Sequence, residues 1–218
     1  MKEKLFTFAR LIFGLALCAS STVFMLNSNL GLSPWDVFHQ GLSILTGITI
    51  GQASILIGIL FVVLGVFLGQ KLGFGTILNM ILVGQFIDII MYIDIIPKAS
   101  SVFMGVIMMI IGMLIMGLGC YFYIGCGLGC GPRDGVMVAL SIKLNKSIKC
   151  VRSSMEIIVL IMGYFLGGNV GIGTFISAFF LGYSLQLVFK FKNFNPEKVR
   201  HRSVLESLNL SSRCRENQ

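Results

Sequence analysis

Long apolar stretches, separated by short polar or glycine-rich segments, dominate the pattern along the chain. A helix needs about 20 apolar residues to cross a hydrocarbon core of about 30 Å. The stretches of this kind lie at residues 5–26, 53–69, 74–92, 101–124, 153–167 and 172–190. We therefore predict an all-α polytopic membrane protein with six transmembrane helices. The second and fifth stretches are short for a crossing, which indicates local thinning of the bilayer or helices that begin from a partly buried loop.

Two shorter segments, 34–46 and 132–143, follow the related motifs GLSPWD and GCGPRD. A helix of about 13 residues covers only about 20 Å, which is too short to cross a bilayer. A crossing here would also move the basic loop at 143–152 to the outside. We predict instead that both segments are half-helices that are re-entrant or lie at the membrane interface.

The prolines of these motifs are expected to begin the half-helices. Proline is favoured at the first helical position, because its missing N–H has no partner there in any case. With Pro34 or Pro132 at that position, Ser33 or Gly131 becomes the N-cap. The aspartate two residues after each proline then takes the third helical position, in a variant of the capping box.

The two motifs belong to an internal repeat with an offset of 98 residues, the separation of Pro34 from Pro132. Repeated small and polar residues at one offset are much less frequent by chance than repeated leucines. The paired positions include Gly14 and Gly112, Gly31 and Gly129, Asp36 and Asp134, Gly65 and Gly163, Gly69 and Gly167, Gly73 and Gly171, Gly75 and Gly173, Thr76 and Thr174, and Gly84 and Gly182.

Each half of this repeat contains three predicted crossings, so the second half must enter the membrane from the opposite side. We predict two inverted three-helix repeats, residues 1–98 and 99–190, each with one half-helix, followed by a basic cytoplasmic tail at 191–218. Secondary transporters are often built in this way, with the binding site near the midplane where the repeats meet. From Asn195 onward the tail has the pattern of a capped helix at the interface or in the cytosol.

Composition and charge agree with a membrane protein and set its orientation. Hydrophobic residues make up 56% of the chain, charged residues 12%, and the mean hydropathy is +0.90. If the N-terminus is cytoplasmic, nearly all lysines and arginines lie on the cytoplasmic side and Lys98 lies outside, as the positive-inside rule requires. Both termini are then cytoplasmic. The net charge of +8 is then explained by topology and by contact of the basic residues with anionic lipid headgroups, so we do not expect a nucleic-acid partner.

The motifs allow a structural and a functional interpretation. In the structural one, each aspartate caps its helix and complements the helix dipole. In the functional one, two broken elements bring backbone groups and carboxylates into a protein-lined cavity. Since a carboxylate offsets the anion preference of a helix N-terminus, a cation, an amine or a coupling proton is at least as good a ligand as an anion. The candidate substrate-binding residues are Ser33, Pro34, Asp36, Gly131, Pro132, Arg133 and Asp134, with Asp88 and Gln186 as a polar lining of the third helix in each repeat.

The two copies differ at two positions where specificity could arise. Trp35 stands where the second copy has Arg133, and His39 stands where it has Met137. An outer tryptophan and an inner arginine also fit simple membrane anchoring. Alternatively, Arg133 pairs with the neighbouring aspartate or neutralises an anion.

Other features of the sequence favour packing. The GxxxG pairs, Gly65 with Gly69 and Gly163 with Gly167, allow close helix approach. In each Gly-x-Gly-Thr motif the threonine is expected to be an N-cap. Arg152 and Glu156 are spaced for an ion pair on one helix face. The six cysteines have no metal-ligand spacing and are expected to be packing residues.

GLSPWD followed by GCGPRDG, with Gly-x-Gly-Thr after each, resembles the YczE-like group of bacterial integral membrane proteins, which includes YyaS and is related to YitT-type proteins. The resemblance covers about residues 5–190. It implies a multi-pass protein of the bacterial inner membrane and supplies no substrate or catalytic residues. The family's Gly-Pro-x-Asp pattern matches the second copy, whereas the first copy has Ser33 in place of glycine.

These observations favour a small transporter or permease for an unknown small solute or ion. The alternative is a non-transporting membrane scaffold or regulator that binds a cytoplasmic partner. An enzyme is not expected, since the chain has no recognisable pairing of nucleophile and base, metal-ligand set or phosphate loop, and no cofactor is predicted. The expected partners are the lipid bilayer, the solute and, through the GxxxG faces, a second copy of the chain.

Overall fold

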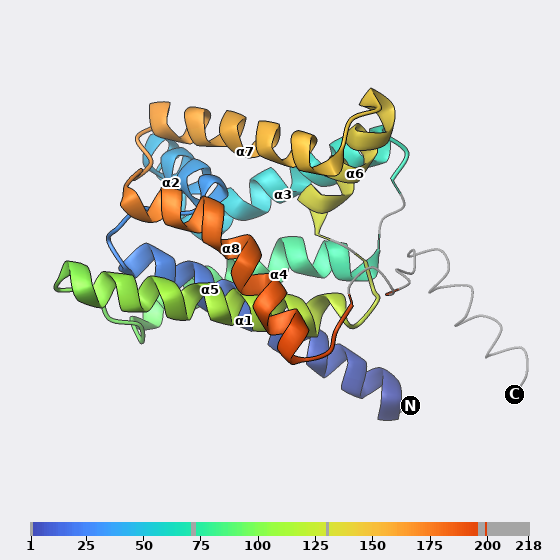
Figure 1. The fold of residues 1–218 in the computed structure, drawn as a ribbon, viewed down its shortest axis with the longest axis horizontal. Coiled ribbons are helices and arrows are strands. Elements are labelled where there is room, and N and C mark those ends of the chain that lie inside the picture. Colours follow the sequence, from blue (N-terminus) through green and yellow to red (C-terminus); the bar gives the residue numbers. More distant parts are fainter. Residues whose placement is uncertain (1, 71–72, 130, 196–198, 200–218) are drawn as a thin grey trace, which may run out of the picture.

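The structure is a computed structural model that describes residues 2–70, 73–129, 131–195 and 199 (Figure 1). Within these ranges every regular element is an α-helix. The helices are α1 (Lys2–Asn27), α2 (Pro34–Thr46), α3 (Ile50–Phe67), α4 (Phe74–Ile93), α5 (Val102–Ile124), α6 (Pro132–Leu144), α7 (Ile148–Phe165) and α8 (Ile172–Phe191). The all-α prediction is confirmed. Except for its first residues, the predicted tail lies outside the described part of the chain.

Five of the six predicted crossings have the length and composition of a membrane span: α1, α3, α4, α5 and α8. The helix α7 has 18 residues, the same length as α3, but its first half carries Lys149, Arg152 and Glu156. The charged side chains of Arg152 and Glu156 form the predicted ion pair, with 3.0 Å between Nε and Oε1. The sixth crossing stays a prediction.

The two predicted half-helices are present as α2 and α6, each of 13 residues. Each begins at its proline after an extended N-cap residue, Ser33 or Gly131, as predicted. Each ends at a residue in the left-handed conformation, Gly47 with φ of 74° or Asn145 with φ of 52°. A left-handed residue closes a helix by letting its N–H reach back to the last turn, and glycine and asparagine adopt it most readily.

The Gly-x-Gly-Thr motifs start their helices differently from the prediction. The N-caps are Gly73 and Gly171, so Thr76 and Thr174 occupy the third helical position. From there the Thr174 hydroxyl accepts a hydrogen bond of 3.2 Å from the N–H of Gly171. The prediction of threonine N-caps was wrong, because a third-position hydroxyl can satisfy the N-cap N–H from inside the helix.

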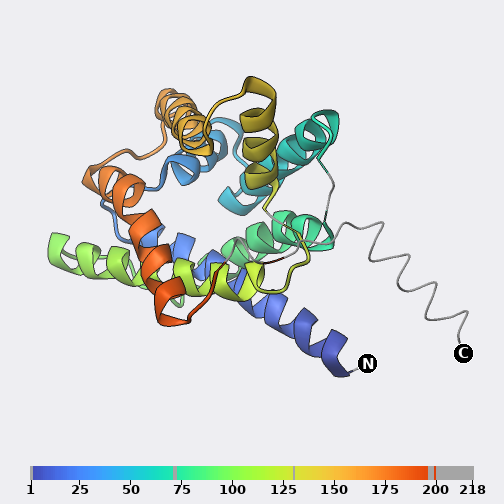
Figure 2. The same cartoon turned by 45° about the vertical axis from the view of Figure 1, so that its right-hand side comes forward.

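The helices α1 and α5 lie side by side, with α4 packed against α1 and α8 against α5 (Figures 1 and 2). Small residues make this contact close: a Cβ atom on Gly14 would stand 2.7 Å from the backbone nitrogen of Tyr123. The half-helices lie away from this pair, with α2 packed against α7 and α6 against α3. They therefore sit between elements of the two halves of the chain.

The GxxxG glycines serve contacts within the chain. A Cβ atom on Gly163 would stand 2.6 Å from the nitrogen of Phe38, so this glycine lets α7 approach α2. Gly65 faces Val136 of α6, with 3.6 Å from a Cβ built on the glycine to the valine Cγ2. Gly69 and Gly167 instead follow the last helical turn with positive φ. The packing role is confirmed for Gly163, which joins α7 to α2, whereas Gly65 makes an ordinary contact with α6 and a Cβ atom on Gly69 would meet nothing within 4 Å.

The 98-residue offset also relates the structural elements. The helices α2, α3 and α4 begin and end 98 residues before α6, α7 and α8. Two backbone hydrogen bonds, both 2.7 Å long, join the halves in the same reciprocal way: Gly75 N–H donates to Leu128 C=O, and Gly173 N–H donates to Leu30 C=O. One bond joins the start of α4 to the turn before α6, and the other joins the start of α8 to the turn before α2.

Candidate functional site

The first turn of α2 holds a buried carboxylate. The Ser33 hydroxyl donates to Oδ2 of Asp36 at 2.6 Å and accepts from the Asp36 N–H at 3.4 Å. These contacts satisfy the N-cap and orient the carboxylate at the same time. Asp36 is only 8% exposed, so its charge requires partners within the protein.

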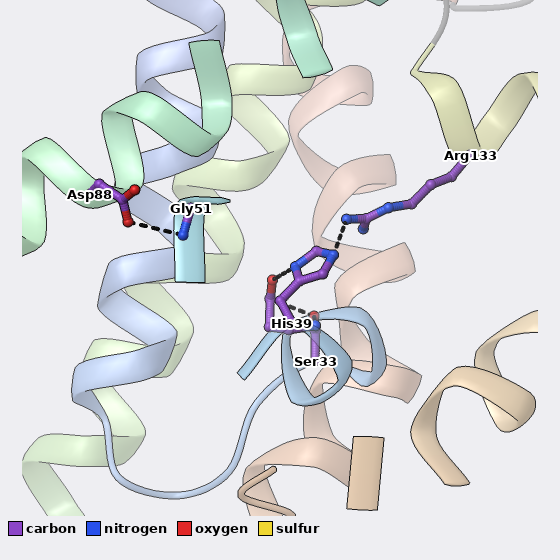
Figure 3. A network of polar contacts seen from close by, with 6 residues as sticks. Ser33, His39, Gly51, Asp88 and Arg133 are labelled. Atoms are coloured by element: carbon purple, nitrogen blue, oxygen red, sulfur yellow. Dashed lines mark hydrogen bonds and ion pairs between the residues drawn. The ribbon is translucent and has the colours of Figure 1, made fainter. Parts of the chain in front are cut away.

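His39 lies one turn further along α2 and is 1% exposed. Its Nδ1 stands 3.7 Å from Oδ1 of Asp36, and its Nε2 stands 2.8 Å from a terminal nitrogen of Arg133 (Figure 3). A guanidinium can only donate, so Nε2 must accept and carries no proton. The imidazole is therefore neutral in this arrangement, and its proton lies on Nδ1, which faces Asp36 from beyond hydrogen-bond distance.

Arg133 reaches this pair from the first turn of α6, the half-helix of the other motif (Figure 3). Its Cζ lies 4.3 Å from the centroid of the Trp35 ring, within the range of a cation–π interaction. Trp35 in turn makes an edge contact with Phe61 of α3, with 5.2 Å between ring centroids. Trp35 and Arg133 occupy equivalent positions in the two motifs, and their side chains contact one another.

These residues form what we call the motif cluster: Ser33, Trp35, Asp36, His39 and Arg133. Its carboxylate and guanidinium lie on opposite sides of a neutral imidazole. The carboxylate faces Nδ1 of the ring and the guanidinium binds Nε2, so the imidazole lies between Asp36 and Arg133. One negative and one positive charge give a net charge of zero, which limits the cost of keeping both away from water.

The remaining predicted site residues lie outside the motif cluster. Asp134 is exposed and stays at its own helix start, where a Cβ atom on Gly131 would lie 3.1 Å from its Oδ2. Asp88 accepts a hydrogen bond from the Gly51 N–H at 2.9 Å, at the start of α3 (Figure 3). It also accepts one from the Thr49 hydroxyl at 2.5 Å. Gln186 is exposed on α8. The two prolines begin their helices and add no polar side-chain group.

Sequence reasoning did not place Trp35 and His39 among the candidate binding residues. The comparison of the two copies had marked both, because each replaces a different residue at the offset of 98. Only the three-dimensional arrangement could show that Trp35 and His39 of the first motif contact Arg133 of the second. Within the described ranges, no group of three or more His, Cys, Asp or Glu side chains is arranged to hold a metal ion.

The comparisons with known proteins agree with this picture. Residues 5–190 match the family of unknown function DUF6198. The chain belongs to this family. A Haemophilus influenzae protein described as uncharacterised is 39% identical over 180 residues, covering 83% of this chain and 82% of that protein. The uncharacterised membrane protein YczE of Bacillus subtilis is 37% identical over 158 residues, covering 72% and 73%.

A third relative, the uncharacterised protein YyaS of Bacillus subtilis, is 25% identical over 181 residues, covering 81% of this chain and 86% of that protein. No solved structure matches the chain. The predicted resemblance to the YczE-like group is confirmed. With five helices able to cross a bilayer, the DUF6198 chain is a multi-pass membrane protein.

Proposed function

We propose that this DUF6198 protein is a small transporter of the bacterial inner membrane, with both termini in the cytoplasm and a solute site at the motif cluster. The observation that carries the proposal is the contact of the buried Asp36 and His39 with the partly buried Arg133. Its members come from half-helices in the two halves of the chain. Buried ionisable groups in a membrane protein are costly, and they generally mark pathways for solutes, ions or protons.

The six-span topology is supported by the length and charge distribution of α7. Its charges, Lys149, Arg152 and Glu156, occupy the first half of the helix, and its second half, from Ile157 to Phe165, is apolar. The Arg152–Glu156 ion pair lowers the cost of bringing charge near the bilayer. With α7 as a crossing, each half has three crossings and the halves are inverted.

The inverted arrangement is further supported by the reciprocal hydrogen bonds at Leu30 and Leu128 and by the contact of Trp35 with Arg133. A two-fold relation brings equivalent residues together only near its axis. The Trp35–Arg133 contact therefore fits an axis that passes through the motif cluster. In inverted-repeat transporters the substrate site occupies this place.

The chemistry of the motif cluster suits a small solute with charged or polar groups. Arg133 contributes donors beyond the one used by His39, and Asp36 contributes acceptors. A solute that replaces the Arg133–His39 bond exchanges one set of hydrogen bonds for another, so little desolvation cost is added. The neutral imidazole also gives the site a group that can accept a proton as the solute enters.

The proposal is tested by thermal shift of the detergent-purified full chain with small cations, amines, amino acids and organic anions across pH. We expect at least one class to stabilise the wild type and to have no effect on Asp36→Asn. The matched control is Asp94→Asn, which removes the same charge at the end of α4, where left-handed backbone accepts either residue. Equal responses of all three proteins would contradict a site at Asp36 and favour the scaffold.

A further inference from the structure

Equivalent helices in the two halves pack unequally. The helix α3 packs against α4, whereas α7 and α8 make at most marginal contact in the described part of the chain. Figure 1 shows α8 running away from α7 and across α5. The two pairs nevertheless have equal lengths and equivalent starting residues. The difference therefore lies in how the helices are placed rather than in where they begin and end.

The α3–α4 pair is closed by four residues that we call the outer seam: Thr49, Gly51, Gly84 and Asp88. A Cβ atom on Gly84 would stand 2.5 Å from the carbonyl oxygen of Gly51, so the backbones are in direct contact. One turn further along α4, the Asp88 carboxylate binds the Gly51 N–H and the Thr49 hydroxyl. The α3 N-terminus is thus held by a charged acceptor, a stronger partner than a neutral one.

The equivalent residues of the second half form what we call the inner seam: Ser147, Lys149, Gly182 and Gln186. A Cβ atom on Gly182 would meet nothing within 4 Å. The side chains of Ser147, Lys149 and Gln186 are exposed. The small residue that allows close approach in α4 is therefore retained in α8, where no described helix packs on it. The small residue of α3 is not retained in α7, because Lys149 stands where α3 has Gly51, and a Cβ atom on Gly51 would collide with the backbone oxygen of Gly84.

We propose that the two seams are alternating gates, with Asp88 holding the outer seam closed in a cytoplasm-facing state. In the other state, α7 approaches α8 at Gly182, less closely than α3 approaches α4 because Lys149 carries a side chain, while Asp88 releases Thr49 and Gly51. Two repeats of one ancestral unit can exchange conformations, which is the basis of alternating access in inverted-repeat transporters. This inference rests on the proposed transport function and adds the gating residues that lie outside the motif cluster.

The test is disulfide formation in membranes that contain the full chain with its six native cysteines replaced by serine or alanine. A disulfide requires Cα atoms about 4.4–6.8 Å apart, so each bond reports a closed seam. The outer pair is Thr49→Cys with Asp88→Cys. The inner pair is Lys149→Cys with Gln186→Cys, and Ser147→Cys with Gln186→Cys is a second inner pair.

The outer pair lacks the Asp88 carboxylate but keeps the close contact of Gly51 with Gly84, so we expect it to oxidise, and we expect both inner pairs to oxidise slowly but to completion. Adding Asp88→Asn to an inner pair removes the charged acceptor, and we expect inner oxidation to become roughly tenfold faster. Adding Asp94→Asn, which removes a charge at the end of the same helix, should leave the rate unchanged. Elution as a single species in detergent checks that each variant is folded.

The proposal is overturned if neither inner pair oxidises in folded protein, with or without Asp88→Asn, while the outer pair does. It is also overturned if Asp94→Asn accelerates inner oxidation as much as Asp88→Asn. No solute is needed for this readout. If the disulfides form as expected but no solute response depends on Asp36, the gates are retained and the solute site is rejected. If a solute response depends on Asp36 but the inner pairs do not oxidise, only the gates are rejected.

Discussion

Replacing Arg133 by glutamine is expected to destabilise the protein by breaking the contact between the two motifs. The change removes a hydrogen bond between a charged donor and His39, which contributes about 1.5–3 kcal/mol. It also removes the cation–π contact with Trp35, which contributes about 0.5–2 kcal/mol. Part of this is offset because a partly buried charge no longer needs to be desolvated. The expected net loss in the free energy of unfolding is about 2 kcal/mol.

The assay is thermal unfolding in detergent, followed by the loss of helical circular dichroism. For a chain of this size, about 2 kcal/mol corresponds to a Tm decrease of roughly 4–8 °C. The matched control is Arg152→Gln, which removes an arginine whose side chain is 54% exposed in a pair with Glu156. Exposed pairs contribute about 0–1 kcal/mol, so its Tm should fall by about 4 °C or less.

A double-mutant cycle separates the contribution of Trp35. In a Trp35→Phe background, Arg133→Gln should cost about 0.5–1 kcal/mol less, because phenylalanine offers a weaker ring to the cation. Equal Tm values for Arg133→Gln and Arg152→Gln would refute the reasoning. They would show that the guanidinium makes no specific contact with the first motif in solution.

Three further predictions address packing, capping and topology. Gly84→Ala should destabilise the protein by about 1–3 kcal/mol, because its Cβ would stand 2.5 Å from a backbone oxygen. In the same thermal unfolding assay, Gly182→Ala should be neutral or slightly stabilising. Ser33→Ala should cost about 0.5–2 kcal/mol through loss of the α2 cap, and an unchanged Tm would mean that this cap contributes nothing. Two variants that each keep a single cysteine, either Lys98→Cys or the native Cys150, test the topology in intact cells. Lys98→Cys should react with a membrane-impermeant maleimide and Cys150 should not, and the opposite labelling would mean that the topology is reversed.

Much of the architecture could be predicted because apolar length and helix-start signals are local properties. The half-helices were placed correctly, since Pro34 and Pro132 define their starts and a short apolar run limits their length. Segment ends were less accurate for α3 and α7. Each begins several residues before its apolar stretch, because Thr49 and Ser147 cap the helix from polar sequence.

The motif cluster was only partly predictable, because it depends on contacts between distant segments. Asp36 and Arg133 could be chosen from the sequence, since charge in an apolar chain is rare. The contacts of His39 and Trp35 with Arg133 could not be predicted, because nothing local shows that residues 94 or more apart are neighbours. The position of Asp88 likewise depends on how α4 packs against α3. Its carboxylate caps that helix instead of lining the motif cluster.

Solute flux into proteoliposomes tests the central claim most directly. Solutes that stabilise the purified protein in the thermal-shift screen would be offered in labelled form to vesicles containing wild type, Asp36→Asn or Asp94→Asn. The account predicts uptake above that of protein-free vesicles for wild type and Asp94→Asn, and none for Asp36→Asn. Binding without uptake in wild-type vesicles, or equal uptake in all three, would contradict it.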